Sequence, residues 1–130
     1  MPVAAPTSNV VEVDGSALSV EVSAQLESAI VVDRLTAPDT FVLLFADPNR
    51  DVLGKAGLEI GKKVVISTSS VTSDSPAVLI EGEVTSIESE YDALGVRAVV
   101  RGYDKSHRLA AGRKTVTFQG VTYSDIASQI

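Results

Sequence analysis

The side chains best suited to acid–base chemistry lie together near residue 105. Asp104, Ser106 and His107 are the three residue types of a hydrolase triad, and His107 is the single histidine of the chain. They stand within four consecutive positions, so their side chains diverge instead of converging on one bond. The chain has no cysteine, which excludes a thiolate nucleophile and a cysteine zinc site. This pattern favours a local turn over a catalytic centre, and we predict neither enzymatic activity nor a cofactor.

Four glutamates on predicted strands raise the question of glycosidase chemistry. Glu81 and Glu83 can share one strand face, as a pair of catalytic carboxylates must. The chain has no tryptophan, and only 5% of its residues are aromatic, so it lacks platforms for sugar rings. We therefore interpret the acids as solvated strand residues; they are Glu81, Glu83, Glu88 and Glu90.

A calcium loop is suggested by three oxygen-bearing residues at alternate positions. Asp47, Asn49 and Asp51 have the right spacing. The loop also needs glycine at its sixth place and a bidentate acid at its twelfth, and those places hold Val52 and Leu58. We predict a turn here, without a metal ion.

A phosphate-binding loop is suggested by the segment from Gly57 to Lys62. The spacing between its glycines is one residue too short, and Lys63 stands where serine or threonine belongs. We therefore interpret Lys62 and Lys63 as the start of a strand.

The overall composition describes one globular domain with an acidic surface. The chain has 130 residues, 45% of them hydrophobic, and a net charge of −6. This charge disfavours generic binding to nucleic acid or to an anionic membrane. Residues 97–114 depart from it, with six basic side chains and one acidic one. An acidic body with one basic segment suits contacts between copies, although a solvated charged hairpin explains it equally well.

The elements that must position these residues are mostly strands. Twenty valines and closely spaced turn signals predict seven to nine short strands, in an antiparallel barrel or sandwich. Asp14-Gly15 predicts a hairpin between residues 10–13 and 17–22. The other predicted strands cover residues 26–35, 41–45, 63–67, 77–87, 96–103 and 114–118. We expect residues 1–14 to be a flexible lead-in and first strand, and residues 15–130 to form the domain.

Three local features add detail to this pattern. Residues 41–45 are apolar without alternation, which is typical of a strand covered on both faces. Gly82 is expected to mark a β-bulge, because the alternation of inward-facing residues along the strand shifts by one position there. The three glycines between residues 54 and 61 predict a loop.

The C-terminal residues contain a helix start signal. Thr122 and Asp125 form a capping pair, and Ile126 and Ile130 lie four apart on one helix face. Two turns make a marginal isolated helix. We therefore expect that the chain is part of something longer, or alternatively that a short helix docks on the barrel.

Three segments of the last third resemble a known family. They are Gly-Tyr-Asp-Lys-Ser-His-Arg-Leu at 102–109, Thr-Val-Thr-Phe at 115–118 and Thr-Tyr-Ser-Asp-Ile-Ala at 122–127. Together with the preceding Glu-Gly-Glu-Val strand at 81–84, they resemble the hub proteins of contractile injection machines. These are the phage late-control D family, its VgrG relatives and the hub–spike proteins of extracellular injection systems. The resemblance covers roughly residues 78–127.

The resemblance implies a tube-like antiparallel β-barrel in a structural protein. Such proteins form homotrimers whose six barrels join the hexameric inner tube to the trimeric spike. The implied partners are further copies, the tail-tube protein and spike components, with no nucleic acid and no membrane contact. Assembly would occur in the cytoplasm, before incorporation into a virion tail or injection particle. This chain resembles most of the first barrel, without the second barrel, the needle or a lytic domain.

The resemblance also implies roles for individual residues. Tyr103 and Leu109 would pack in a core or interface, while Asp104, His107 and Arg108 would fix a turn by hydrogen bonds to the backbone. The structural motif residues are Gly102, Tyr103, Asp104, His107, Arg108, Leu109, Phe118, Tyr123, Asp125 and Ile126. The basic residues that would line a channel or meet a neighbour are Arg97, Arg101, Arg108 and Arg113.

Two other functions remain open at this point. A stand-alone β-sandwich that binds carbohydrate or a surface protein fits the same strand pattern. A hydrolase using Asp104, His107 and a serine is the third hypothesis. Neither explains the three motif segments.

Overall fold

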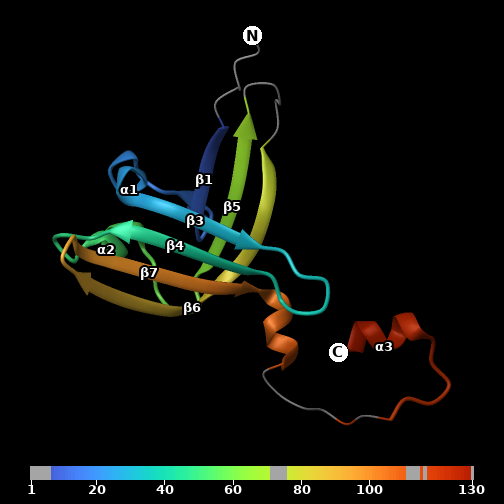
Figure 1. Ribbon diagram of the computed structural model, residues 1–130. Helices are drawn as coiled ribbons and strands as arrows, with labels where there is room; N and C mark the ends of the chain where they lie inside the picture. Colours follow the sequence, from blue (N-terminus) through green and yellow to red (C-terminus); the bar gives the residue numbers. More distant parts are fainter. Residues whose placement is uncertain (1–6, 71–75, 111–114, 116, 130) are drawn as a thin grey trace.

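The computed structural model describes residues 7–70, 76–110, 115 and 117–129, which form one antiparallel sheet with short helices around it (Figure 1). The strand order is β2-β1-β5-β6-β7-β4-β3. The strands are β1 (Thr7–Val13), β2 (Ser16–Ala17), β3 (Leu26–Val32), β4 (Thr40–Ala46), β5 (Lys63–Ser70), β6 (Ala77–Asp92) and β7 (Gly95–Asp104). The mainly β, antiparallel class is therefore confirmed.

The sheet does not close into a barrel, so the prediction of a closed tube-like barrel is wrong. β2 and β3 stand at the two ends of the strand order and do not pair with each other. The expected strand at residues 114–118 is not formed by Thr115, Thr117 or Phe118, and its remaining residues lie outside the described ranges. Periodicity predicts which residues form strands and faces. It does not specify whether the first and last strands meet.

β6 holds the two halves of the sheet together. Its first part pairs with β5 and its second part with β7, and the two sets of partners overlap at residues 82–83. Figure 1 shows β1, β5 and the start of β6 running across the direction of β3, β4 and β7. The sheet is thus folded over itself at β6, and its concave side encloses the core.

Two glycines permit the close approach at this fold. A Cβ atom on Gly82 would lie 2.5 Å from the carbonyl oxygen of Tyr103. A Cβ atom on Gly102 would overlap both the carbonyl oxygen of Glu83 and the ring of Phe41. Both glycines are buried, and the Phe41 ring is 1% exposed. Only glycine leaves room for the ring against the two strands at this point.

The predicted bulge at Gly82 is displaced in the structure. The register of β6 shifts at Thr85 against β7, and at Leu79 against β5. Gly82 lies between these two irregularities and is itself paired on both sides. The inward parity therefore changes at Thr85, because the strand must turn its apolar face while it passes from one half of the sheet to the other.

Short helices fill the connections between strands. α1 (Val20–Gln25) begins after Ser19, whose hydroxyl accepts a hydrogen bond from the Val22 amide at 3.2 Å. α2 (Val52–Ala56) occupies part of the segment predicted as a glycine loop. The 3-10 helix η1 (Lys105–Ala110) follows β7, and α3 (Tyr123–Gln129) lies apart from the sheet (Figure 1). In the described part of the chain, no helix has the length and apolarity to cross a membrane.

The first hairpin is the one predicted. Asp14 and Gly15 both have positive φ angles, of 50° and 84°, as the favoured two-residue hairpin turn requires. The second strand ends at Ala17, however, because α1 takes over much of the expected strand 17–22. β1 pairs with β5 over its whole length, so the first strand is an integral part of the sheet.

One apolar cluster stabilises this arrangement. The three largest fully buried side chains are Phe41, Leu43 and Phe45, which alternate along β4. Each helix that precedes β5 contributes to the same cluster. The buried members are Val11, Val13, Val22, Phe41, Leu43, Phe45, Val52, Leu58, Val64, Ile66, Ile80, Val84, Ala98 and Val100.

The glycine contact at the fold gives a stability prediction. Gly102→Ala is expected to lower the free energy of unfolding by about 1–3 kcal/mol, the usual cost of overpacking, because the new methyl group meets backbone and ring. Gly54→Ala is the matched control, since a Cβ there has nothing within 4 Å and lies in a helix. Urea unfolding followed by circular dichroism measures both. Equal destabilisation of the two variants would contradict this account of the fold.

Candidate assembly surface

The convex side of β3, β4 and β7 carries an apolar stripe. Strand alternation turns Val42 and Leu44 away from the core that their neighbours fill. Ile30 lies opposite Val42, and Val99 lies opposite Leu44, so these pairs share a face. Ile30 is 53% exposed, Val42 and Leu44 are half-buried, and Val99 is 2% exposed. We call this set the outer stripe; its members are Ile30, Val32, Val42, Leu44 and Val99.

The outer stripe ends at an open strand edge. β3 is the last strand of the sheet, and in the described ranges it pairs only with β4. Residues 28–32 contain no charge and no proline, although such residues usually protect an edge against pairing with another chain. This combination of β-branched residues and a free edge is suited to strand addition.

The opposite edge of the sheet is open for most of its length. β2 pairs only with Glu12 and Val13 of β1. The part of β1 before these residues is paired with β5 on one side and with no described strand on the other, although the Val11 carbonyl accepts a hydrogen bond from the Leu18 amide at 3.0 Å. The folded sheet therefore presents two different edges, β3 and β1.

The arginines of the basic segment are already paired within the chain. Arg97 lies 3.0 Å from Glu27 and 2.7 Å from Asp92, and these two carboxylates raise the pKa of its guanidinium. Arg101 contacts Glu88 at 2.8 Å.

Arg108 donates to both carboxylate oxygens of Glu83, from Nε at 3.3 Å and from a terminal nitrogen. Arg113 lies outside the described residues. The arginines expected to meet a neighbour or line a channel thus have internal partners wherever the structure describes them.

The four glutamates considered as possible catalytic acids have different surroundings in the structure. Glu81 forms an ion pair with Lys63 at 2.6 Å, which lowers the pKa of its carboxyl. Glu83 and Glu88 pair with the two arginines just described, and Glu90 is exposed. Three of the four therefore act as partners for cations.

Asp104 is the centre of a tight turn where β7 passes into η1. Its carboxylate accepts hydrogen bonds from the Ser106 amide at 2.9 Å, the Ser106 hydroxyl at 2.5 Å and the Asp39 amide at 3.2 Å. Its own amide donates to the Asp39 carbonyl at 3.0 Å. The Asp39 carboxylate in turn accepts from the Arg34 amide at 2.8 Å. These bonds fix η1 to the loop between β3 and β4.

The same contacts do not make a hydrolase triad. His107 Nδ1 lies 2.6 Å from the backbone oxygen of Asp104, not from its carboxylate. The Ser106 hydroxyl donates to Asp104 directly, so the histidine is not between them. His107 instead stacks on Tyr103, with ring centroids 5.9 Å apart. Asp104 and His107 make the backbone contacts that the motif implied, whereas Arg108 binds a side chain.

The remaining motif residues are spread over two regions. Gly102 is buried at the fold of the sheet. Tyr103 and Leu109 are 40% and 70% exposed, so they are not core residues. Phe118 is half-buried and belongs to no strand. The capping pair is confirmed: the Asp125 amide donates to Thr122 Oγ1, and the Thr122 amide to Asp125 Oδ2. The helix it starts contains Tyr123 and Ile126 and buries no residue.

The patterns that resembled a calcium loop and a phosphate loop have structural roles. Asp47 is 4% exposed, and its carboxylate accepts from the amides of Asp51 and Val52 at the start of α2. Gly57 ends α2 in a left-handed conformation. Lys62 pairs with Asp14 at 3.0 Å as β5 begins. Among the described residues no cluster of acids and histidine has the arrangement of a metal site.

The sequence contained one signal for the outer stripe. The unbroken apolar run at residues 41–45 predicted cover on both faces of the strand. The structure buries Phe41, Leu43 and Phe45 but leaves Val42 and Leu44 half-buried. The second face is thus only partly covered by this chain.

Comparison with known proteins adds no relative. No protein-family model matches the chain, and no curated protein matches it significantly. The functional inference therefore depends on the outer stripe, the two open edges and the motif segments.

The Asp104 turn predicts a dependence of stability on pH. The hydrogen bond from the Ser106 side chain, followed by those from backbone amides, lowers the pKa of Asp104 below its ordinary value of 3.8. A lowered folded-state pKa contributes stability that is present above the unfolded value and lost as pH falls through the folded value. At pH 7, Asp104→Asn should therefore lower the free energy of unfolding by roughly 1 kcal/mol. This difference should shrink below pH 3.8.

Urea titrations at several pH values measure this difference. Asp33→Asn is the control, because Asp33 is exposed and lies outside the turn. A constant difference between the protein and Asp104→Asn down to pH 2 would show that the charge of Asp104 does not stabilise the turn.

Proposed function

We propose that the chain is a structural component of the baseplate hub of a contractile phage tail or injection system. In this role it joins the hexameric inner tube to the trimeric spike by contacts between copies and with the tube and spike proteins. The observation that carries the proposal is a folded sheet with two open edges, one bordered by the outer stripe. The motif segments at 102–109, 115–118 and 122–127 support it through their resemblance to hub proteins.

The two edges suit head-to-tail assembly. β3 and β1 are different surfaces, so an edge of one copy that pairs with the other edge of the next makes a heterologous contact. Repeated contacts of this kind close into a ring when the rotation between copies allows it. A sheet that stays open within one chain can then be completed by its neighbours around a channel.

The outer stripe supplies apolar area beside that edge. Ile30 and Val32 are on β3 itself, and they are 53% and 41% exposed. A neighbouring strand would remove them from water, which stabilises association in proportion to the apolar area buried. Arg97 and Arg101, whose charges are paired internally, flank the stripe on β7. The mechanism is geometric and needs no chemical step.

Assembly is the test of this proposal. The tagged chain, co-expressed with tube and spike proteins of a contractile tail, should recover both in pull-downs and give rings by electron microscopy. Recovery of neither protein, together with a monomer that binds glycan, would instead support a carbohydrate-binding module.

A matched pair of variants tests the edge. Ile30→Lys places a charge in the outer stripe at the edge strand and is expected to abolish recovery of partners, because a lysine there opposes strand pairing. Ile60→Lys is the control, since Ile60 is 62% exposed in the loop before β5. Both substitutions should change the free energy of unfolding by less than about 0.5 kcal/mol. Equal recovery by the two variants would rule out the β3 edge as the contact.

A further inference from the structure

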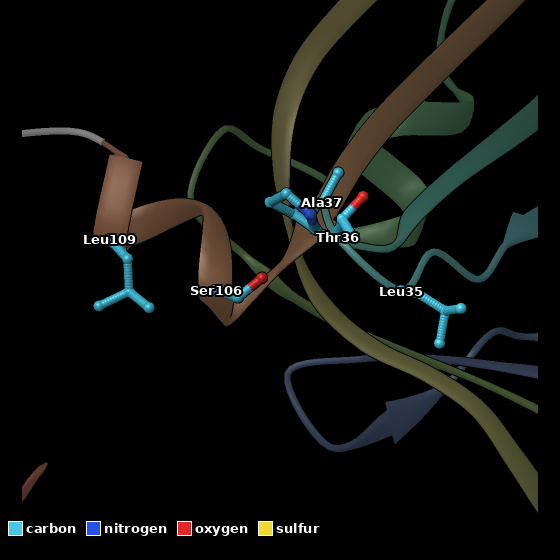
Figure 2. A pocket seen from close by; sticks show the side chains of 6 residues that line it. Leu35, Thr36, Ala37, Ser106 and Leu109 are labelled. Atoms are coloured by element: carbon cyan, nitrogen blue, oxygen red, sulfur yellow. The ribbon is translucent and has the colours of Figure 1, made fainter.

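A shallow hollow lies between η1 and the loop that connects β3 to β4. Figure 2 shows Ser106 and Leu109 on one side of it and Leu35 to Ala37 on the other. Its volume is about 460 Å³, and Pro38 completes its lining. Leu35 and Leu109 are 103% and 70% exposed, so two large apolar side chains stand uncovered at its rim. The hydrogen bonds between Asp104 and Asp39 fix η1 to the β3–β4 loop, so the two walls of the hollow are held in place.

Two cations are chain neighbours of residues that line the hollow. Arg34 precedes Leu35, and Lys105 precedes Ser106. Of the lysines and arginines that the structure describes, six form ion pairs with carboxylates and Arg50 lies over the Tyr91 ring. Arg34 and Lys105 are the two for which the described contacts include neither. Lys105 is close enough to Glu81 to help lower the pKa of that carboxyl, whereas the Arg34 side chain has no carboxylate partner among the described contacts. The hollow therefore combines apolar rims with nearby positive charge, which suits an apolar segment that carries an acid.

α3 has the complementary composition. Tyr123 is 92% exposed, and Ile126 lies three positions later on the same helix face. Asp125, one position before Ile126 and so on another side of the helix, is exposed and acidic. α3 has seven residues and buries none of them, and a helix this short is marginal in water without a surface to pack on.

We propose that the hollow between η1 and the β3–β4 loop binds α3 of a second copy of the chain. Tyr123 and Ile126 contact Leu35 and Leu109, and Asp125 faces the cations. The contact goes beyond the edge pairing proposed above and does not require the hub role, because it needs only copies of this chain.

The position of the hollow favours a second copy as the occupant. The β3–β4 loop continues directly from the open edge of β3, so the hollow borders the side on which a neighbouring chain would sit. In the same molecule α3 stands apart from the sheet (Figure 1), with Tyr123 92% exposed and Ile126 half-buried. A chain that exposes both a short helix and a surface suited to bind it can exchange that helix between copies, as in domain swapping.

Cross-linking between single-cysteine variants tests the proposal. The chain has no cysteine of its own that could react in their place. Thr36→Cys labels the hollow, and Gln129→Cys labels the end of α3. Mixed and treated with a short bis-maleimide, these variants should give mixed dimers several-fold more efficiently than Ala93→Cys mixed with Gln129→Cys. Ala93 is also exposed, in the turn between β6 and β7.

A second pair of substitutions identifies the apolar contact. Leu109→Asp added to Thr36→Cys should reduce the mixed dimer to the level of the Ala93→Cys control. Leu94→Asp should leave it unchanged, because Leu94 is 84% exposed in the same distant turn. Circular dichroism verifies that both variants remain folded.

Two outcomes would overturn the proposal. The first is a yield of mixed dimer no higher than that of the control. The second is a cross-link within one chain in a Thr36→Cys, Gln129→Cys double variant that is independent of protein concentration, since α3 would then dock on its own molecule. Loss of pull-down partners by Ile30→Lys with intact cross-linking would separate this contact from the edge contact.

Discussion

The close contact of Gly82 and Gly102 beneath the Phe41 ring is the constraint on which the rest of the structure depends. It brings the backbones of β6 and β7 together where β6 changes partners, so one strand serves both halves of the sheet. The fold at this point creates the concave core and a convex face that the described part of the chain covers only in part. The core and the candidate assembly surface therefore have one origin.

Much of the local structure could be predicted from the sequence, because its causes are local. The Asp14-Gly15 hairpin and the Thr122–Asp125 cap follow from backbone preferences within four residues. Closure of the sheet could not be predicted, since it depends on whether β2 and β3 meet in space. The bulge was placed at Gly82 instead of Thr85 for a related reason. Gly82 is required by a ring from β4, which the sequence around it does not reveal.

The candidate site was predictable only in part. The residues with chemical potential, such as Asp104 and His107, have structural roles that their clustering in one turn already indicated. The ion pairs of Arg97 and Arg101 join distant strands, so a count of charges along the chain overstated how basic this segment is in the folded molecule. The open β3 edge follows from the strand order, which the sequence does not reveal. The run of apolar residues around Val42, without alternation, was the one sequence feature related to it.

The internal pairing of Arg97 and Arg101 determines how the contact between copies would respond to salt concentration. A contact driven by opposite charges on two molecules weakens as dissolved salt screens them, over a Debye length of about 8 Å at physiological ionic strength. Here those charges are already matched inside each molecule, and the β3 edge offers peptide groups and aliphatic side chains instead. Neither depends strongly on ionic strength. A β3 edge contact of this kind would tolerate transfer between a dilute and a saline environment without loosening.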